Sequence, residues 1–380
     1  MSFSMLGIKT CRSNQWWKTS KNCRLLKLMD CCPSNVSLRS YAAQSAVNIT
    51  HILLKYVEGF HSQKHDALLQ HTPRRPIPKG YKTVFHPLRA TTIDESTVDG
   101  NLHVHDDVYL VQLDKNPDEL NDIAVPSFND QLTNARIRGG QILRQKDVTP
   151  FDRREVFQLA FGGFHLAMNL IWGILENHRG TINQTGSLTH LFAVLEKTWL
   201  GGEHPDYHTL LAALTQILHG LILNAWRTEC GYPSLDDFEK TNPSPEHILS
   251  IAYKIMAKYT VLEPHFSATN PKVPLQDLNM DQSPTFVTAD AQTSDGEETT
   301  EPDEPPDSTD VVYDNIILLT RDLLYATELV DAMATGDFGR VEDILPTLAC
   351  MFRGVGSNNY STEILHLLFS LKEVWTPEFA

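Results

Sequence analysis

The feature that most constrains the fold is a long acidic stretch with few apolar residues. Between Val273 and Thr320 the chain has no Lys or Arg, whereas twelve Asp and Glu residues occur from Asp277 to Asp314. Residues 267–310 are rich in Pro, Asp, Glu, Thr and Ser, and such a composition buries too little apolar surface to offset the entropy cost of ordering. We therefore predict a disordered acidic insert over 267–310, which interrupts one helical domain.

The formal net charge of −15 comes mostly from this insert. Without the twelve acidic residues from Asp277 to Asp314 the rest of the chain carries only about −3, and so the overall acidity says little about partners. Hydrophobic residues make up 41% and charged residues 21% of the chain, which excludes the fully disordered, collagen-like and disulfide-dense classes.

Residues 1–80 are predicted to form a basic, cysteine-containing and poorly ordered segment that ends in a Pro- and Arg-rich linker at 73–78. The first 29 residues hold six Lys and Arg and no acidic residue. An ordinary tail, a nucleic-acid contact and a mitochondrial presequence all remain open for them. The spacing of the four cysteines in this segment matches no standard zinc finger, and we expect free thiols in an intracellular protein of the nucleus or cytoplasm.

Hydrophobic periodicity predicts a mainly α protein with a small β portion, an α+β fold. Residues 81–266 form the core of the domain and 311–380 its C-terminal helical part. The Gly162-Gly163 pair is expected to end a short strand before the first helix of the core. Strands are predicted at 102–105, 108–113 and 123–128, and helices near 41–60, 164–177, 187–199, 207–229, 245–262, 312–335, 338–352 and 361–374.

Two uncharged stretches, Val156–Leu175 and Tyr207–Trp226, are long enough to cross a membrane. In the first, Gln158, His165 and Asn169 recur at spacings that place them on one face of a helix. A one-sided polar stripe fits a buried helix that faces a wet cleft better than a helix that faces lipid. We predict two core helices and no membrane association.

The residues that could carry chemistry lie near a predicted strand end. Asp130 directly follows the strand at 123–128, and a carboxylate in that position can hold a divalent metal. It fits equally well as the N-cap of a helix that begins with Gln-Leu-Thr. His165 could be a general base or metal ligand, or a hydrogen-bonded histidine of the core. No Walker loop, dinucleotide fingerprint, HExxH sequence or nucleophile elbow is present in the sequence.

A basic run follows Asp130. Residues 130–154 contain six Arg and Lys against three Asp. Beside a metal-binding carboxylate, such a run suits a groove that contacts the phosphates of nucleic acid, with DNA as the partner. A solvated helix face with mixed charges is the alternative. The candidate contact residues are Arg136, Arg138, Arg144 and Lys146.

The order of these sequences resembles a known family. Phe128-Asn129-Asp130-Gln131-Leu132-Thr133, followed by Arg136 and Arg138 and then by Gly163-Phe164-His165, resembles the core of the domain of unknown function 6589 family. That family is widespread in mushroom-forming fungi and associated with transposable elements. Gly336-Asp337-Phe338-Gly339-Arg340 extends the resemblance, which covers about 80–380 apart from the insert.

The resemblance implies a transposon-derived protein and, by analogy, a degenerate RNase H-like core at about 83–180 with carboxylates at strand ends. Asp130 would then be a metal ligand, for Mg²⁺ or Mn²⁺, and Asp130 and His165 would be catalytic. Three departures weaken this expectation. The upstream Asp-Asn pair of the family is missing, Asn129 stands where Gly is common, and the chain stops at Ala380, about where related sequences continue.

We therefore expect a copy that is shortened at both ends. It would descend from a metal-dependent nucleic-acid-processing enzyme and would itself be inactive, because two-metal phosphoryl transfer needs several converging carboxylates. The alternative is a non-enzymatic helical interaction protein whose acidic insert binds a partner.

Overall fold

The computed structural model describes residues 31–262, 310–376 and 379. Most of the predicted acidic insert, and the basic residues of the first 30 positions, lie outside the described residues. The order and disorder predicted for them are therefore not addressed by the structure.

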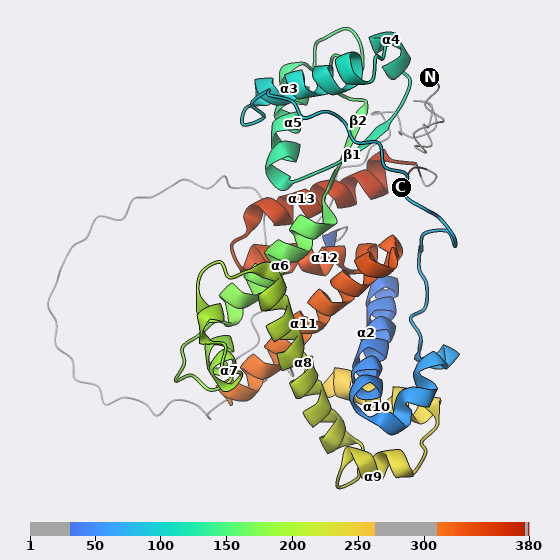
Figure 1. The fold of residues 1–380 in the computed structure, drawn as a ribbon, viewed down its shortest axis with the longest axis vertical. Coiled ribbons are helices and arrows are strands. Elements are labelled where there is room, and N and C mark those ends of the chain that lie inside the picture. Colours follow the sequence, from blue (N-terminus) through green and yellow to red (C-terminus); the bar gives the residue numbers. More distant parts are fainter. Residues whose placement is uncertain (1–30, 263–309, 377–378, 380) are drawn as a thin grey trace, which may run out of the picture.

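Helices dominate the described chain, and two short strands form a small sheet (Figure 1). This confirms the predicted mainly α class with a small β portion. In chain order the α-helices and strands are α2 Asn35–Tyr56, α3 Val98–Asp106, α4 Pro117–Leu120, β1 Val125–Asn129, α5 Gln131–Leu143, β2 Phe157–Phe161, α6 Gly163–His178, α7 Leu188–Val194, α8 Tyr207–Glu229, α9 Leu235–Lys240, α10 Pro245–Tyr259, α11 Val311–Thr335, α12 Phe338–Gly354 and α13 Asn358–Phe369. Shorter 3-10 turns lie at Glu58–His65, Ala67–Leu69 and Thr198–Gly201, and π-helical turns at Asp107–Gln112 and Ser370–Val374.

The two strands and α5 make one βαβ unit. β1 and β2 pair in parallel, with Val125 opposite Phe157 and Asn129 opposite Phe161. Parallel strands need a crossover connection, and α5 supplies it. Because both strands run the same way, their carboxyl ends lie at one edge of the sheet. This edge positions the predicted site.

The βαβ unit, α3 and α4 form the upper part of the molecule in Figure 1 and enclose a small core. The buried Arg154 ties α3 to this part: its guanidinium lies 3.3 Å from the Leu102 carbonyl oxygen and 2.6 Å from an Asp106 carboxylate oxygen. The small core consists of Leu120, Val125, Phe151, Val156 and Phe157.

The lower part is a helical bundle built around the larger core. Helices α2, α6, α8, α10, α11 and α12 contribute to it. Trp226 of α8 is completely buried, and its indole N–H donates to the carbonyl of Ile49 in α2, 3.1 Å away. A buried indole needs such a partner because a lost hydrogen bond is costly inside a core. Although α2 falls within the predicted N-terminal segment, it is part of this bundle.

Helix α8 is long and apolar enough to cross a membrane by length and composition, the one such helix within the described ranges. Its residues Leu210, Leu214 and Ile222 are buried in the larger core. The core helix of a soluble protein passes the same test, and so the helix is weak evidence of a membrane. The expectation of no membrane association stays a prediction.

Helix α13 lies between the two parts and contacts α5 and β2 above and α12 below (Figure 1). A second connection is made by residues 74–77, which we call the strap. The backbone amides of Arg74 and Arg75 donate to the carboxylate of Asp337 at 2.8 and 2.7 Å. The amide of Ile77 donates to the carbonyl of Gly336 at 2.9 Å. The predicted linker is thus bound along the turn between α11 and α12.

Two of the three predicted strands are wrong. Residues 102–105 belong to α3, and 108–113 lie mostly in the π-helical turn that follows. Thr97 starts α3 as an N-cap that accepts from the amide of Gly100 at 2.9 Å. The alternation of apolar and polar residues suggested a strand, but Leu102 and His105, three apart, face the interior of the upper part as on one side of a helix. The third strand is confirmed as β1, as is the strand break at Gly162-Gly163.

Candidate functional site

The carboxyl edge of the two strands gathers the predicted catalytic residues. Asp130 follows the last residue of β1, and the Gly162–His165 sequence follows the last residue of β2. The amide of Gly162 donates to the carbonyl of Asn129 at 2.8 Å, which extends the pairing to the end of the strands. The structure therefore brings Asp130 and His165 to the same edge of the sheet.

Asp130 serves as the N-cap of α5. One carboxylate oxygen accepts from the backbone amide of Thr133 at 2.7 Å. Burial alone would raise the pKa of Asp130, but the hydrogen bonds from Thr133 and the nearby charges of His165 and Arg136 bring this pKa below its ordinary value. Asp130 is thus ionised at neutral pH and is held by a backbone hydrogen bond, and His165 is an exposed neighbour.

A second carboxylate lies at this edge, and no sequence motif marks it. Glu363 of α13 is only 3% exposed. Asn134 donates to it at 3.1 Å, and the guanidinium of Arg138 pairs with it through both nitrogens, one of them 3.2 Å away. Burial raises the pKa of Tyr360, one turn earlier on α13, and the negative charges of Asp130 and Glu363 raise it further. The same Asn134 donates to the carbonyl of Ala160 in β2 at 3.1 Å and accepts from the side chain of Asn129 at the end of β1, 3.0 Å away, which places Glu363 beside the strand ends.

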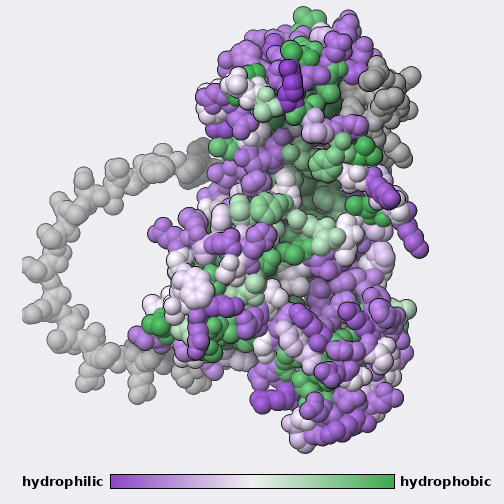
Figure 2. All heavy atoms as spheres, viewed as in Figure 1, coloured by the Kyte–Doolittle hydropathy of each residue, from purple (hydrophilic) through white to green (hydrophobic). Residues whose placement is uncertain are grey.

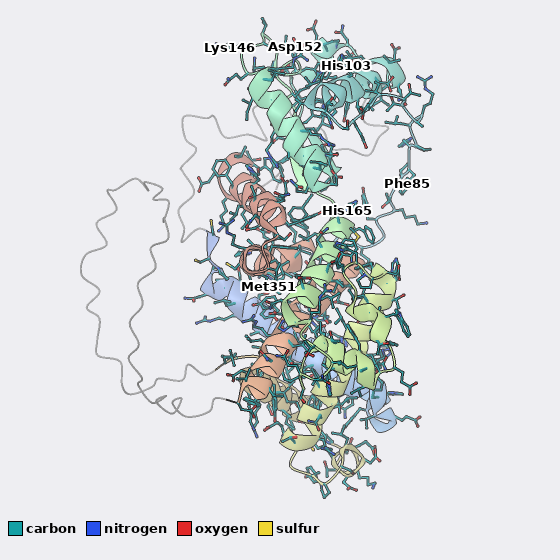
Figure 3. The ribbon with its side chains drawn as sticks, turned by 90° about the vertical axis from the view of Figure 1, so that its left-hand side faces the viewer. Phe85, His103, Lys146, Asp152, His165 and Met351 are labelled. Atoms are coloured by element: carbon teal, nitrogen blue, oxygen red, sulfur yellow. The ribbon has the colours of Figure 1, made fainter. Side chains whose placement is uncertain are left out.

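Two of the four predicted nucleic-acid contacts, Arg138 and Arg144, form ion pairs within the chain. Arg138 is used in the pair with Glu363, and Arg144 binds Asp147 at 2.7 Å. Arg136 donates to the carbonyl of Glu95 at 3.1 Å and keeps part of its surface exposed. Lys146 is exposed, and Figure 3 shows it at the end of α5 away from His165. No measurement bears on contact with nucleic acid, which stays a prediction for all four.

The edge does not fit a two-metal centre. Within the residues that the structure describes, no group of three or more His, Cys, Asp and Glu side chains could hold a metal ion. The carboxylate oxygens of Glu363 already bind Arg138 and Asn134, and Asp130 caps the N-terminus of α5. A guanidinium that binds a carboxylate already neutralises the negative charge that would attract a Mg²⁺ ion. We derive no catalytic step through a metal from this arrangement.

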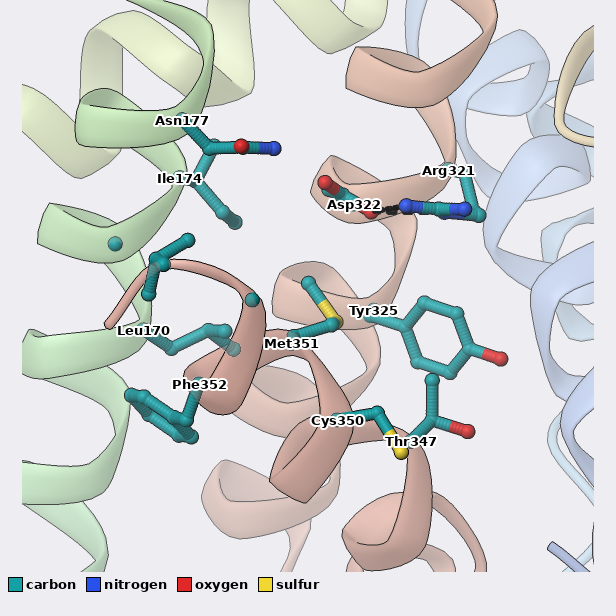
Figure 4. Close-up of a pocket in the computed structure, with 13 residues that line it drawn as sticks. Leu170, Ile174, Asn177, Arg321, Asp322, Tyr325, Thr347, Cys350, Met351 and Phe352 are labelled. Carbon is teal, nitrogen blue, oxygen red and sulfur yellow. Dashed lines mark hydrogen bonds and ion pairs between the residues drawn. The ribbon is translucent and has the colours of Figure 1, made fainter. Parts of the chain in front are cut away.

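A second polar cluster lines a cavity of about 430 Å³ between α6, α11 and α12 (Figure 4). Asn177 and Asp322 point toward it from α6 and α11, and Leu170 and Ile174 line one side. The Asp322 carboxylate lies 2.8 Å from a nitrogen of His178 and 2.8 Å from the Nε of Arg321. Because both neighbours already bind it, we read this cluster as a structural contact that joins α6 to α11.

An apolar groove of about 490 Å³ lies on the open face of the sheet. Phe128 of β1, which is 70% exposed, lines it together with Ile77 of the strap and Trp375. The Trp375 indole donates to the side chain of Gln158 at 2.7 Å. In Figure 2 apolar surface gathers around a hollow between the upper part and the bundle.

The fold and the site define a mainly helical protein with one small parallel βαβ unit, in which Asp130 follows a strand end and the buried Glu363 of α13 lies beside it, each bound by groups of the chain itself. The chain belongs to a family of unknown function, DUF6589, whose family model matches residues 20–380. This confirms the family resemblance read from the sequence motifs. No curated protein and no solved structure matches the chain.

Proposed function

We propose that the chain is a nucleic-acid-binding protein, derived from a fungal transposable element and descended from a metal-dependent nucleic-acid-processing enzyme, that does not itself cleave nucleic acid. One observation supports the proposed descent from such an enzyme. Asp130 lies at a strand end, and Asn134 binds both Glu363 of α13 and the carbonyl of Ala160 in β2, which places the second carboxylate at the same edge of the parallel βαβ unit. Carboxylates at the carboxyl ends of parallel strands are how nuclease folds of the RNase H type hold their metals.

The loss of catalysis follows from what now binds those carboxylates. Arg138 takes the place of a cation at Glu363, and the Thr133 amide holds Asp130. Two-metal phosphoryl transfer needs free carboxylate oxygens that converge on the ions. The edge therefore supports a folded scaffold, and the retained activity in this proposal is binding.

Binding is tested with the full chain and a fluorescently labelled DNA, in single-stranded and double-stranded form, by fluorescence anisotropy over a series of salt concentrations. The proposal predicts saturable binding whose affinity falls as salt rises, because cations of the protein release counterions from phosphates. Absence of binding at low salt would contradict it and would favour the alternative, a helical interaction protein with protein partners only.

A further inference from the structure

One segment of the surface combines positive charge with exposed aromatic rings. From residue 67 to residue 93 the chain contains no Asp or Glu, and it contains five Arg and Lys. The stretch includes the strap, residues 74–77, and directly after it residues 78–89, which we call the arm.

The arm is fixed at both ends and open between them. The amide of Ile77, just before it, is bound to Gly336 at 2.9 Å. At the other end, the backbone of Arg89 exchanges two hydrogen bonds with the side chain of Gln112, at 2.8 and 3.2 Å. Every residue of the arm is exposed, and none lies in a helix or strand. The protein therefore presents this segment at a defined place on its surface.

The cations of the strap and of the arm differ in their partners. Arg74 is paired with Asp343 at 2.8 Å and Arg75 with Glu342 at 2.9 Å. Among the described residues, Lys79, Lys82 and Arg89 of the arm form no ion pair. Their charges are available to an external anion.

The aromatic rings of the arm are also without cover. Phe85 is 85% exposed and Tyr81 60% exposed. Figure 3 shows Phe85 on the flank of the molecule, away from the packed helices. Exposed rings that alternate with unpaired cations along the chain are a pattern that suits single-stranded nucleic acid, because bases stack on the rings while the cations contact phosphates.

We propose that the arm is a binding site for single-stranded nucleic acid, with Tyr81 and Phe85 stacking on bases and Lys79, Lys82 and Arg89 contacting phosphates. This inference rests on the proposed function for the claim of binding, and it replaces the basic run of α5 as the principal contact. An acidic peptide would use the cations of the arm but gain little from the flat faces of its rings, and so the aromatic residues discriminate between the two partners.

The test measures the affinity of the full chain for a labelled single-stranded oligothymidylate by anisotropy. Replacing both rings, Tyr81→Ala with Phe85→Ala, should weaken binding at least about tenfold. The matched control is Trp199→Ala, which removes an equally exposed aromatic ring (65%) outside the arm and should leave the affinity unchanged. Thermal melting of each variant confirms that the exposed substitutions leave the fold intact.

The cations have a separate readout. In Lys79→Gln with Lys82→Gln, the slope of log affinity against log salt should fall by about 1.4, since each phosphate contact on a single strand contributes about 0.7. Lys64→Gln, an exposed lysine outside the arm, serves as the control and should leave the slope unchanged.

The outcomes separate the two proposals. If the chain binds the oligothymidylate but the arm variants bind as the wild type does, the arm inference is overturned and the proposed function stands. If the wild-type chain does not bind the oligothymidylate, both the proposed function and the arm inference are overturned. If polyglutamate displaces the oligothymidylate and the ring variants retain full affinity, the arm binds acidic polymers through charge alone, which also overturns the inference.

Discussion

At the scale of single residues, the chemistry of this protein depends on which side chain neutralises a buried carboxylate. Glu363 lies 3% exposed on α13, and Arg138 reaches it from α5 across 225 residues of sequence. A buried ion pair gives little net stability, but removing one partner leaves the other charge buried without compensation. Arg138 thus belongs to the joint between the upper part and the bundle, although the sequence presents it as one cation in a basic run.

Replacing Arg138 should therefore be far more costly than replacing its neighbour on the same helix. Arg138→Met is expected to lower the free energy of unfolding by about 3 kcal/mol, because Glu363 then keeps a buried and uncompensated charge. Arg136→Met, which removes a partly exposed guanidinium, should cost less than about 1 kcal/mol. Urea denaturation measures both.

A third variant separates the charge from the packing. Arg138→Met combined with Glu363→Leu removes both charges and should recover most of the lost stability. Equal, small losses in Arg138→Met and Arg136→Met would show that the pair does not hold α5 to α13.

The sequence could predict part of this site and not the rest. Asp130 and His165 each follow a strand within a few residues, and the parallel pairing of the strands brings them to one edge. The role of Asp130 as a helix N-cap could also be predicted, because the Gln-Leu-Thr sequence after it begins a helix. Glu363 lies in a helical stretch after a long intervening bundle, and no local pattern marks a buried glutamate there. Its partner and its burial arise only from tertiary packing.

At the scale of elements, helices with strong apolar periodicity and clear caps were predictable to within a few residues. Helix α8 matches its prediction, and α11 ends at Gly336, which takes the left-handed conformation that favours glycine (φ +69°). The strands predicted at 102–105 and 108–113 are wrong because tertiary contacts decided between strand and helix there. One such contact is the ring of His105 against Phe157, with 4.0 Å between the ring centroids. Residues 73–78, predicted as a linker, are bound to the turn between α11 and α12 because Asp337 accepts hydrogen bonds from two of their amides.

The strap gives a prediction for this scale. A methyl group at Gly336 would lie 2.5 Å from a carbon of Ile77, in a conformation that L-residues rarely adopt. Gly336→Ala should therefore lower the free energy of unfolding by about 1–2 kcal/mol and release the strap. Hydrogen exchange of the Ile77 amide, now bound to Gly336, should become faster.

The control is a glycine at the end of the next helix. A methyl group at Gly354 would meet no atom within 4 Å, and Gly354→Ala should leave both the stability and the exchange rate of Ile77 unchanged or slightly improve the stability. An unchanged exchange rate in Gly336→Ala would mean that the strap is not fixed by this turn.

At the scale of the whole molecule, the upper part and the bundle are joined by α13 from within and by the strap from outside (Figure 1). The arm continues from the strap along the flank and ends at Gln112 of the upper part. A single strand of nucleic acid bound along the arm, as we propose, would therefore contact both parts of the molecule. This contact would not require the carboxylate edge.

The measurement that tests this account most directly is divalent-dependent cleavage of DNA by the full chain. Wild type, Asp130→Asn and Glu363→Gln are incubated with labelled single-stranded and double-stranded DNA in Mg²⁺ and in Mn²⁺, with a metal-free reaction beside each. Asp130→Asn keeps the helix cap, because Asn and Asp cap equally well, and weakens only a metal ligand. We predict that all three proteins leave the DNA intact. Cleavage by the wild type that needs the metal and disappears in Asp130→Asn would show a working centre at this edge and would contradict the account.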